Sequence, residues 1–420
     1  MLFIPFIFFL CLTVYWWKKH QGLDICVYMS GLYAITSFFA IIVVIDDLLG
    51  VGGTLFDDSD IELNFFPTIL FCSFLALSIL PFSLIYNKRL ENIENQNPRL
   101  LTTLSCLLIL VSLVNIYIVA DSTLDILSGD LSVVRDAVYK GEETPAAIKA
   151  QSLPFVLKYL YLLNYATILS IPIFFYYLCT GQKAWWFKLL LLIASVSGPI
   201  AAIQSADRNE FVFYGMMFLF CIIFFWKMMT KKVKALLVIL TTFFASVFLV
   251  YIIAVSMARF EERDEGASGS IMAYAGQGYL NFCYFWENAN FDLIAPEREF
   301  PMTAHFLYKV DSDEYRRLTR SGQQGFFISV FPTFIGEIML DLSPIGMIIW
   351  VSYYMLIVFL IIKRKERESF DIGEVLIIFT LGVIPVFGIF YYRFFFFTHG
   401  FIILIASSMY ALSKFKIKLL

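Results

Sequence analysis

The sequence has little charge for its length and few of the residues on which metal centres and disulfide frameworks depend. Only 15% of its 420 residues are charged, there are three histidines, and the seven cysteines stand singly with no C-x-x-C spacing. A zinc site or a disulfide framework needs clustered cysteine and histidine, so the sequence supports neither. A Walker phosphate-binding motif is also lacking. We therefore expect a protein that works without a metal or another cofactor.

Hydrophobic residues dominate what is present. They make up 60% of the chain and aromatic residues make up 18%, and the mean hydropathy is +0.78. Soluble domains have about 45–50% apolar and about 25% charged residues. Because helices satisfy their backbone polar groups internally in lipid, we expect an all-α, polytopic membrane protein in contact with a lipid bilayer. A net charge of −3 gives no reason to expect a nucleic-acid partner.

Runs of apolar residues long enough to cross a bilayer recur along the chain. Counting runs of 18–20 residues as spans gives about eleven. The expected spans are Met1–Trp17, Ile25–Ile45, Phe65–Tyr86, Leu100–Ala120, Leu153–Cys179, Phe187–Ile203, Phe211–Trp226, Ala235–Met257, Ile345–Ile362, Glu374–Tyr392 and Phe394–Ser413. We expect a large loop at about 258–325, a half-buried or re-entrant segment at Phe326–Leu340, and a single membrane-embedded domain over residues 1–420.

Lysine and arginine are concentrated after every second one of these spans, beginning with the first. An N-terminus outside the cytoplasm places the basic residues of the short loops on the cytoplasmic side, as the positive-inside rule requires. These residues are Lys18, Lys19, Lys88, Arg89, Arg99, Lys183, Lys188, Lys227, Lys231, Lys232, Lys234, Lys363, Arg364, Lys365, Arg367, Lys414, Lys416 and Lys418. Acidic residues then gather on the opposite face, so the pattern predicts an extracytoplasmic working surface.

The stretch from Gln204 to Tyr214 sets charge between two long apolar runs. Asp207, Arg208 and Glu210 stand together there. Ionisable groups near bilayer depth are costly and usually line a cavity or pair with one another. Two interpretations stay open, a functional site and a polar cap on a helical hairpin in which the charges neutralise one another.

The large loop carries a second set of candidate residues. Arg259 and Arg263 follow directly on a predicted span, where the phosphate of a lipid would lie, and the planar guanidinium group of arginine binds phosphate in a bidentate manner. Tyr279 and Trp286 belong to an aromatic passage. Aromatic rings with a polar handle suit sugar rings, although charged runs are more often solvated surface.

Ionisable residues also lie in late apolar sequence. Glu337 and Asp341 are four residues apart, and therefore on one face if the segment is helical. Arg393 lies between two tyrosines and a run of phenylalanines, and His399 follows that run. An arginine in such surroundings needs an anionic or carbonyl partner. A histidine among aromatic residues is more often structural than catalytic.

Three motifs lie in the middle part of the chain. The first is Arg-Asn-Glu-Phe at Arg208–Phe211, which follows an apolar run. The second is the Gly-Tyr-Leu-Asn-Phe passage that begins at Gly278. The third, Gly336–Gly346, is similar to a Gly-x-x-x-x-Asp-Phe-Gly-x-x-Gly pattern, with Leu342-Ser343 in place of Phe-Gly. The motifs lie within residues 204–346, and together they resemble those of the Wzy-type oligosaccharide repeat unit polymerases of O-antigen and capsule assembly.

The resemblance implies a metal-independent glycosyltransferase of the bacterial inner membrane with a helical architecture like that of GT-C enzymes. Such an enzyme transfers a glycan from undecaprenyl pyrophosphate to the next lipid-linked repeat unit on the extracytoplasmic side, with a chain-length regulator as a possible partner. The implied roles are diphosphate binding for Arg208, Arg259, Arg263 and Arg393, proton acceptance for Glu210 or His399, and substrate contacts for Tyr279, Glu337 and Asp341.

Three other functions remain open. An O-antigen ligase uses the same donor and differs in its acceptor, which the sequence does not reveal. A flippase or other transporter of lipid-linked oligosaccharide would also bury arginines and acids, but it is expected to show internal repeats, which we do not detect. A membrane O-acyltransferase would need a placed histidine, but His20 lies on the expected cytoplasmic side and His305 has no evident partner in the sequence. We rank polymerase first, then ligase, then transporter.

Overall fold

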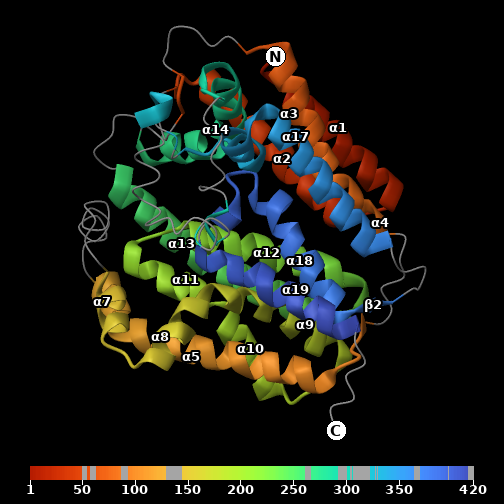
Figure 1. Cartoon of the computed structure of the whole chain (residues 1–420), viewed down its shortest axis with the longest axis vertical. Helices are drawn as coiled ribbons and strands as arrows, with labels where there is room; N and C mark the ends of the chain where they lie inside the picture. Colours follow the sequence, from red (N-terminus) through yellow and green to blue (C-terminus); the bar gives the residue numbers. More distant parts are fainter. Residues whose placement is uncertain are drawn as a thin grey trace. The chain divides into compact units, whose positions relative to one another are not determined.

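The computed structural model of the chain is almost entirely helical (Figure 1). It describes residues 1–49, 54–56, 63–86, 93–128, 144–260, 266–291, 300–302, 305, 322–326, 328, 330–363, 369–395 and 397–414. The only strands among these residues are β1 (Ile93–Glu94) and β2 (Phe370–Asp371), which pair in parallel with Ile93 opposite Phe370. The predicted all-α class is confirmed.

Eight of the described helical segments are long and apolar enough to cross a membrane. They are Ile25–Ile45, Phe65–Ile85, Pro98–Thr123, Phe155–Thr180, Trp185–Ser205, Asn209–Met228, Lys231–Val255 and Thr333–Lys363. The other three expected spans correspond to shorter or more polar helices, α1 (Phe3–His20), α18 (Ile372–Phe387) and α19 (Gly400–Lys414). A helix of 16 residues such as α18 is about 24 Å long, less than the roughly 30 Å of bilayer hydrocarbon.

The chain forms two compact units, each built from segments that are distant in the sequence. Unit 1 comprises Met1–Arg89, Arg263–Glu366 and Leu381–Gly400, and unit 2 comprises Leu90–Glu262, Arg367–Thr380 and Phe401–Leu420. Helix α18 begins in unit 2 and ends in unit 1. Neither unit is a continuous stretch of chain, and the single domain expected over residues 1–420 stays a prediction.

Unit 1 begins with a hairpin of α1 and α2 (Ile25–Ile45). Asp24 caps α2, since one carboxylate oxygen accepts a hydrogen bond from the backbone N–H of Val27 and the other contacts His20. Aspartate at this position satisfies a backbone donor that the first turn of a helix leaves open. The cap fixes where α2 begins.

Helix α14 (Gly266–Asn288) lies within the segment expected to be a large extracytoplasmic loop, and that this segment lies outside the membrane stays a prediction. It packs on α2 and on α3 (Phe65–Ile79). A Cβ added to Gly276 would lie 2.6 Å from the carbonyl carbon of Phe39, so glycine is needed for the close approach to α2. Small residues allow such helix contacts in membrane proteins. These small residues also lower the hydropathy of the segment, so the helix does not stand out as an apolar run in the sequence.

Helix α17 (Thr333–Lys363) is interrupted at Ser343, which has φ +68° and ψ 170° and precedes Pro344. We call residues 333–342 the half-helix. Thr333, at its start, also has a positive φ of +66°, a strained conformation for a β-branched residue. The half-helix therefore matches much of the expected re-entrant segment Phe326–Leu340, and the remainder of α17 covers the expected span from Ile345 to Ile362.

Unit 2 is built around α5 (Pro98–Ser128), which contacts most of the other helices of the unit. The other helices of the unit are, in chain order, α7 (Pro145–Gln151), α8 (Phe155–Leu162), η2 (Leu163–Leu169), α9 (Ser170–Thr180), α10 (Trp185–Ser195), α11 (Ser197–Ala202), η3 (Ile203–Ser205), α12 (Asn209–Phe225), η4 (Trp226–Met228) and α13 (Lys231–Phe260). The first part of α18 and most of α19 complete the unit.

Two spans of unit 2 are interrupted within their length. The span Phe155–Thr180 contains the 3₁₀ segment η2, which has seven residues, although 3₁₀ runs longer than three or four residues are uncommon. The span Trp185–Ser205 breaks at Val196, between α10 and α11. Irregular backbone at membrane depth is tolerated only where it is buried in protein or lines a cavity.

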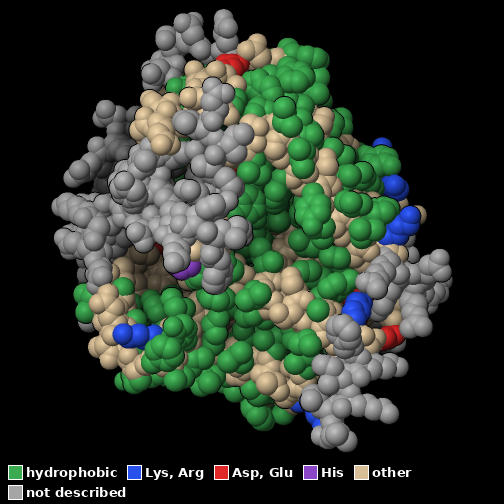
Figure 2. Space-filling model, in the orientation of Figure 1, with side chains coloured by type: hydrophobic (Ala, Val, Ile, Leu, Met, Phe, Trp, Pro, Cys, Tyr) green, Lys and Arg blue, Asp and Glu red, His purple; other side chains and the backbone are tan. Residues whose placement is uncertain are grey.

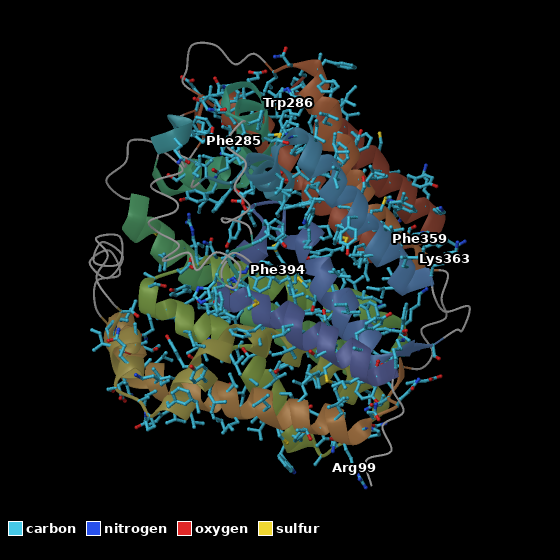
Figure 3. The ribbon with its side chains drawn as sticks, in the orientation of Figure 1. Arg99, Phe285, Trp286, Phe359, Lys363 and Phe394 are labelled. Atoms are coloured by element: carbon cyan, nitrogen blue, oxygen red, sulfur yellow. The ribbon has the colours of Figure 1, made fainter. Side chains whose placement is uncertain are left out.

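The surface fits a bilayer setting. Figure 2 shows hydrophobic side chains over most of the described part of the visible face, with lysine and arginine in a few separate places. Several lysines lie over aromatic rings at helix ends, as is typical of a membrane interface. These pairs are Lys19 with Trp16 (4.8 Å to the ring centre), Lys234 with Trp226 (4.9 Å) and Lys363 with Phe359 (5.0 Å; Figure 3). All three lysines are on the predicted cytoplasmic side.

Candidate functional site

The charged stretch identified in the sequence forms a tight turn between η3 and α12 in unit 2. Ala206 adopts a left-handed conformation with φ +45°, and the backbone N–H of Asp207 donates to the carbonyl of Ala202 over 3.0 Å. The Asp207 carboxylate then accepts from the N–H of Asn209 over 2.9 Å, at the start of α12. The polarity of the stretch thus has a structural component, because the Asp207 carboxylate satisfies a backbone donor of the turn.

Gln204 fastens this turn to α5. Its Nε2 donates to the hydroxyl of Thr123 (2.8 Å) and to the carbonyl of Val119 (3.3 Å), while its Oε1 accepts from the hydroxyl of Ser122 (2.7 Å). The side chain is buried, where each unmade hydrogen bond is costly. We call this set of three hydrogen bonds the Gln204 clamp. It fixes the segment that carries Arg208 and Glu210.

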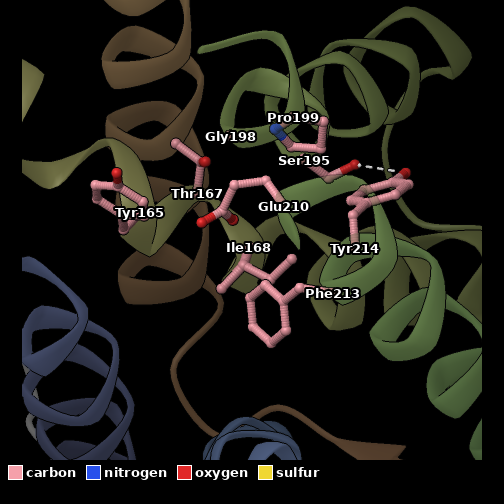
Figure 4. Close-up of a pocket in the computed structure, with 9 residues that line it drawn as sticks. All are labelled: Tyr165, Thr167, Ile168, Ser195, Gly198, Pro199, Glu210, Phe213 and Tyr214. Atoms are coloured by element: carbon pink, nitrogen blue, oxygen red, sulfur yellow. Dashed lines mark hydrogen bonds between the residues drawn. The ribbon is translucent and has the colours of Figure 1, made fainter. Parts of the chain in front are cut away.

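Glu210 lies in the first turn of α12, where the helix dipole favours a negative charge. Its side chain is 8% exposed. It lines a pocket within unit 2 together with Tyr165, Thr167, Ile168, Ser195, Gly198, Pro199, Phe213 and Tyr214 (Figure 4). The carboxylate turns to the Thr167 side of the pocket, away from the Ser195 hydroxyl, which lies 3.2 Å from that of Tyr214.

The pocket is small. Its volume is about 10 Å³, which is room for about one water-sized particle and not for a sugar ring. Two of the lining segments are the interruptions described above, η2 and the α10–α11 break. Glu210 therefore faces irregular backbone of two other spans.

Next to the pocket lies a cluster of buried amides and hydroxyls from three helices. The Thr167 hydroxyl is 3.0 Å from that of Ser197, which donates to Oδ1 of Asn164 over 2.7 Å. Asn115 of α5 donates to the carbonyl of Ser197 over 2.9 Å. These bonds hold η2, α11 and α5 together. The cluster was not predicted, although Asn164, Thr167 and a Gly-Pro pair inside expected spans were signals of polar or irregular backbone.

Arg208 immediately precedes α12 and is half-buried. It belongs to the same unit as Glu210, so the two residues of the Arg-Asn-Glu-Phe motif are held by one clamped turn. Arg259 lies near the end of α13, and its side chain is outside the described part of the structure. Arg263 is also outside the described residues.

Unit 1 contains a second buried set of candidate residues. Glu337 and Asp341 lie on the half-helix, and both are buried. One carboxylate oxygen of Glu337 accepts from the backbone N–H of Tyr392 over 2.7 Å. At the start of the half-helix, the N–H groups of Thr333 and Phe334 donate to carbonyls of residues 390 and 388. The half-helix is thus joined to the chain that follows α18.

Arg393 and His399 lie on that following chain. Arg393 is 1% exposed, and its Nη1 donates to the hydroxyl of Tyr391 over 2.8 Å, with its guanidinium carbon 5.2 Å from the centre of the Phe387 ring. His399 is also buried. Burial, and then the charge of Arg393, hold the pKa of His399 well below its ordinary value. The imidazole is therefore neutral at physiological pH.

The aromatic passage of α14 divides into a buried and a surface part. Tyr279 is buried, and its hydroxyl lies 2.7 Å from that of Thr68. Trp286, near the end of the helix, is partly exposed, and its ring centre is 5.4 Å from that of Phe66 (Figure 3). Between them, Asn281 bonds Gln277 and the N–H of Leu55. In this structure Tyr279 packs inside unit 1, so its contact with a substrate stays a prediction.

The predicted site residues are therefore distributed over both units. Arg208, Glu210 and the backbone of Arg259 belong to unit 2. Tyr279, Glu337, Asp341, Arg393 and His399 belong to unit 1.

Comparisons with known protein families, with curated proteins and with solved structures find no match to this chain. Its function is inferred from its residues and their placement.

Proposed function

We propose that the chain is a membrane glycosyltransferase of the bacterial inner membrane that polymerises undecaprenyl-pyrophosphate-linked oligosaccharide repeat units on the extracytoplasmic face. One observation carries the proposal. The Arg-Asn-Glu-Phe motif, which resembles that of Wzy-type polymerases, lies on a turn that the Gln204 clamp fixes, with Glu210 buried and Arg208 two residues before it. A GT-C-like architecture belongs to the same proposal.

The reaction needs two forms of assistance. The bond between the anomeric carbon and the pyrophosphate oxygen breaks, a bond to the acceptor hydroxyl forms, and that hydroxyl loses its proton. Arg208 would stabilise the negative charge that builds up on the leaving diphosphate. Glu210 would accept the proton, because a carboxylate held away from water is suited to general-base catalysis.

Access to Glu210 is the critical requirement. In this structure the pocket beside it holds about one water-sized particle, so the acceptor sugar would have to approach from outside the pocket or displace its walls. The interruptions at η2 and Val196 are places where the walls can move, since irregular segments are typical hinges.

A second candidate function, transport of a lipid-linked oligosaccharide, is favoured by the interrupted spans. Transporters commonly bind their substrates at discontinuous helices near the middle of the membrane. Among the described spans, three are interrupted, at η2, at Val196 and at Ser343.

A gel of lipid-linked and surface glycans separates these functions. Cells that lack the gene are compared with cells that carry it or its Arg208→Ala variant, with membrane abundance measured for each. The proposal predicts a ladder that collapses to single repeat units in the deletion and in the variant. Fully polymerised glycan that stays on its lipid carrier would indicate a ligase, and an unchanged ladder on the cell surface would contradict polymerisation.

A further inference from the structure

We propose that an anionic phospholipid binds where α5 and α10 begin, on the expected cytoplasmic side, with its phosphate held by Arg99, Lys183 and Lys188 and its acyl chains along the two helices. All three residues belong to unit 2. We call these side chains, together with Trp185 and Trp186, the basic end. The proposal goes beyond glycosyl transfer and does not depend on it.

The first observation is that α5 and the span formed by α10 and α11 run side by side in the same direction. One hydrogen bond joins Asn115 to Ser197 and another joins Ser122 to Gln204, each across 82 positions of the chain. Helix α10 itself also packs on α5. The same register places the first residue of α10 about one helical turn from Arg99. The two helices therefore begin at the same end of unit 2.

The second observation is positive charge without acidic partners. Among the described residues, no acidic side chain forms an ion pair with Arg99, Lys183 or Lys188. Arg99 (Figure 3) and Lys183 are exposed, and Lys188 is half-buried. Lys414, at another helix end of the unit, is instead paired with Glu374. Three basic groups at one helix end are complementary to the phosphate of a lipid headgroup.

The turn before α10 brings two of these charges together. Gly181 and Lys183 both have a positive φ, +69° and +70°, which is uncommon for a residue with a long side chain and recurs where a ligand is held. The Lys183 ammonium nitrogen lies 5.6 Å from the centre of the Phe187 ring. The turn therefore directs this charge over the first turn of α10, which also carries Lys188.

Apolar side chains beside the basic end suit acyl chains. Trp185 and Trp186 are 72% and 60% exposed, and tryptophan is enriched at the level of lipid headgroups. Farther along the helices, Leu107 of α5 and Leu189 of α10 are both exposed, and the register described above places them at the same depth. An anionic phospholipid matches both parts of this surface, whereas a free phosphate ion would use the charges alone.

The test counts the lipids that bind to the purified full-length chain. Native mass spectra are recorded in a neutral detergent as dioleoyl phosphatidylglycerol or dioleoyl phosphatidylcholine is added, and thermal unfolding is followed in parallel. We expect saturable binding of phosphatidylglycerol with a rise in Tm, because a ligand that binds the folded state stabilises it. Phosphatidylcholine, which has no net charge, should bind at least about tenfold more weakly, and sodium phosphate at equal ionic strength should leave the Tm unchanged.

Charge variants assign the binding to the basic end. Arg99→Gln and Lys183→Gln should each raise the phosphatidylglycerol concentration for half-saturation by about fivefold, as expected when one basic residue beside an anionic headgroup is lost. Lys231→Gln and Lys232→Gln are matched controls, because both side chains are exposed at the start of α13 on the same expected side of the membrane. The controls should leave half-saturation unchanged.

Three results would overturn the proposal. The first is equal binding of the two lipids. The second is an equal loss of phosphatidylglycerol binding in the controls, which would show a general attraction to positive charge. The third is a rise in Tm with sodium phosphate alone, which would make a free phosphate ion the ligand. None of these measurements requires glycosyl transfer, so a failure of the polymerase proposal would leave their outcomes unchanged.

Discussion

Replacing Gln204 by leucine should loosen the turn that carries Arg208 and Glu210 without removing either residue. The substitution deletes the three hydrogen bonds of the Gln204 clamp and keeps a side chain of similar size. The partners on α5 do not lose all bonding, because the hydroxyls of Ser122 and Thr123 also donate to the carbonyl of Val119 in their own helix. The expected cost is therefore that of the lost bonds alone.

Each hydrogen bond contributes about 0.6–1.5 kcal/mol, with membrane helices at the lower end. Three bonds give about 2–4.5 kcal/mol for Gln204→Leu. Thr123→Val removes one of them and should cost about 1 kcal/mol. In a double-mutant cycle the two substitutions should therefore show a coupling energy of about 1 kcal/mol, since Thr123 has no clamp partner once Gln204 is replaced.

The assay is thermal unfolding of the purified variants in one detergent, beside the glycan ladder made by cells that express them at equal abundance. We expect a lower Tm for Gln204→Leu and a weaker ladder, because the general base is no longer held in place. Full additivity of the two substitutions, or an unchanged Tm for Gln204→Leu, would refute the clamp.

Three further predictions concern unit 1. Gly276→Val should destabilise the protein by about 3 kcal/mol, because the added Cβ would lie 2.6 Å from the backbone of α2. In the control Gly31→Ala, the atom nearest to the added Cβ is 3.9 Å away, so the Tm should change by no more than about a degree, as is typical of substitutions without a clash. Glu337→Gln should lower the unfolding free energy by about 1 kcal/mol, since a neutral oxygen then accepts from the N–H of Tyr392. An unchanged unfolding free energy in chemical denaturation would exclude an ionised Glu337. The pKa of His399 is lowered in the folded state. Its contribution to stability is therefore present above its unfolded pKa of about 6.5 and is lost below it by up to about 1.4 kcal/mol per pH unit. The Tm should fall from pH 7 to pH 5 in the wild type and fall less in His399→Asn, and equal slopes of Tm against pH would contradict this.

Much of the helical architecture followed from hydropathy alone. The spans that begin near Ile25, Phe65 and Phe211 were placed within a few residues of their ends. Apolar runs of about 20 residues have one stable form in lipid, so pattern and structure agree there. Hydropathy did not indicate the helix α14, where glycine, alanine and amide residues replace the apolar run because that helix packs closely on protein.

The interruptions needed tertiary structure to be seen. The half-helix ends at Ser343-Pro344, a pair that in the sequence indicates only a turn. Its start is held by carbonyls of residues 388 and 390, more than 50 positions later in the chain. Pairings over such distances leave no local pattern, and neither does the interleaving of the two units.

The candidate residues were named from the sequence, and their roles stay predictions, whereas the side chains that support them were not named. Enclosure of Glu337 and Arg393 by protein was expected, because charge within apolar sequence must be enclosed by protein, whereas for Glu210 a polar cap was an open alternative. The partners that enclose them were not foreseen. Gln204 and Thr167 are uncharged and common in membrane helices, so their roles became visible only when the helices were placed against one another.

The central claim is that this chain itself forms the glycosidic bond, and reconstitution tests it most directly. The purified chain in liposomes is given undecaprenyl-pyrophosphate-linked repeat units as its only substrate, beside Glu210→Gln and the control Asp207→Asn. The proposal predicts a glycan ladder with release of undecaprenyl pyrophosphate for the wild type and for Asp207→Asn, and at least a hundredfold loss for Glu210→Gln, about the contribution of a general base. Repeat units that stay single in the presence of the wild-type protein, or a full ladder from Glu210→Gln, would contradict it.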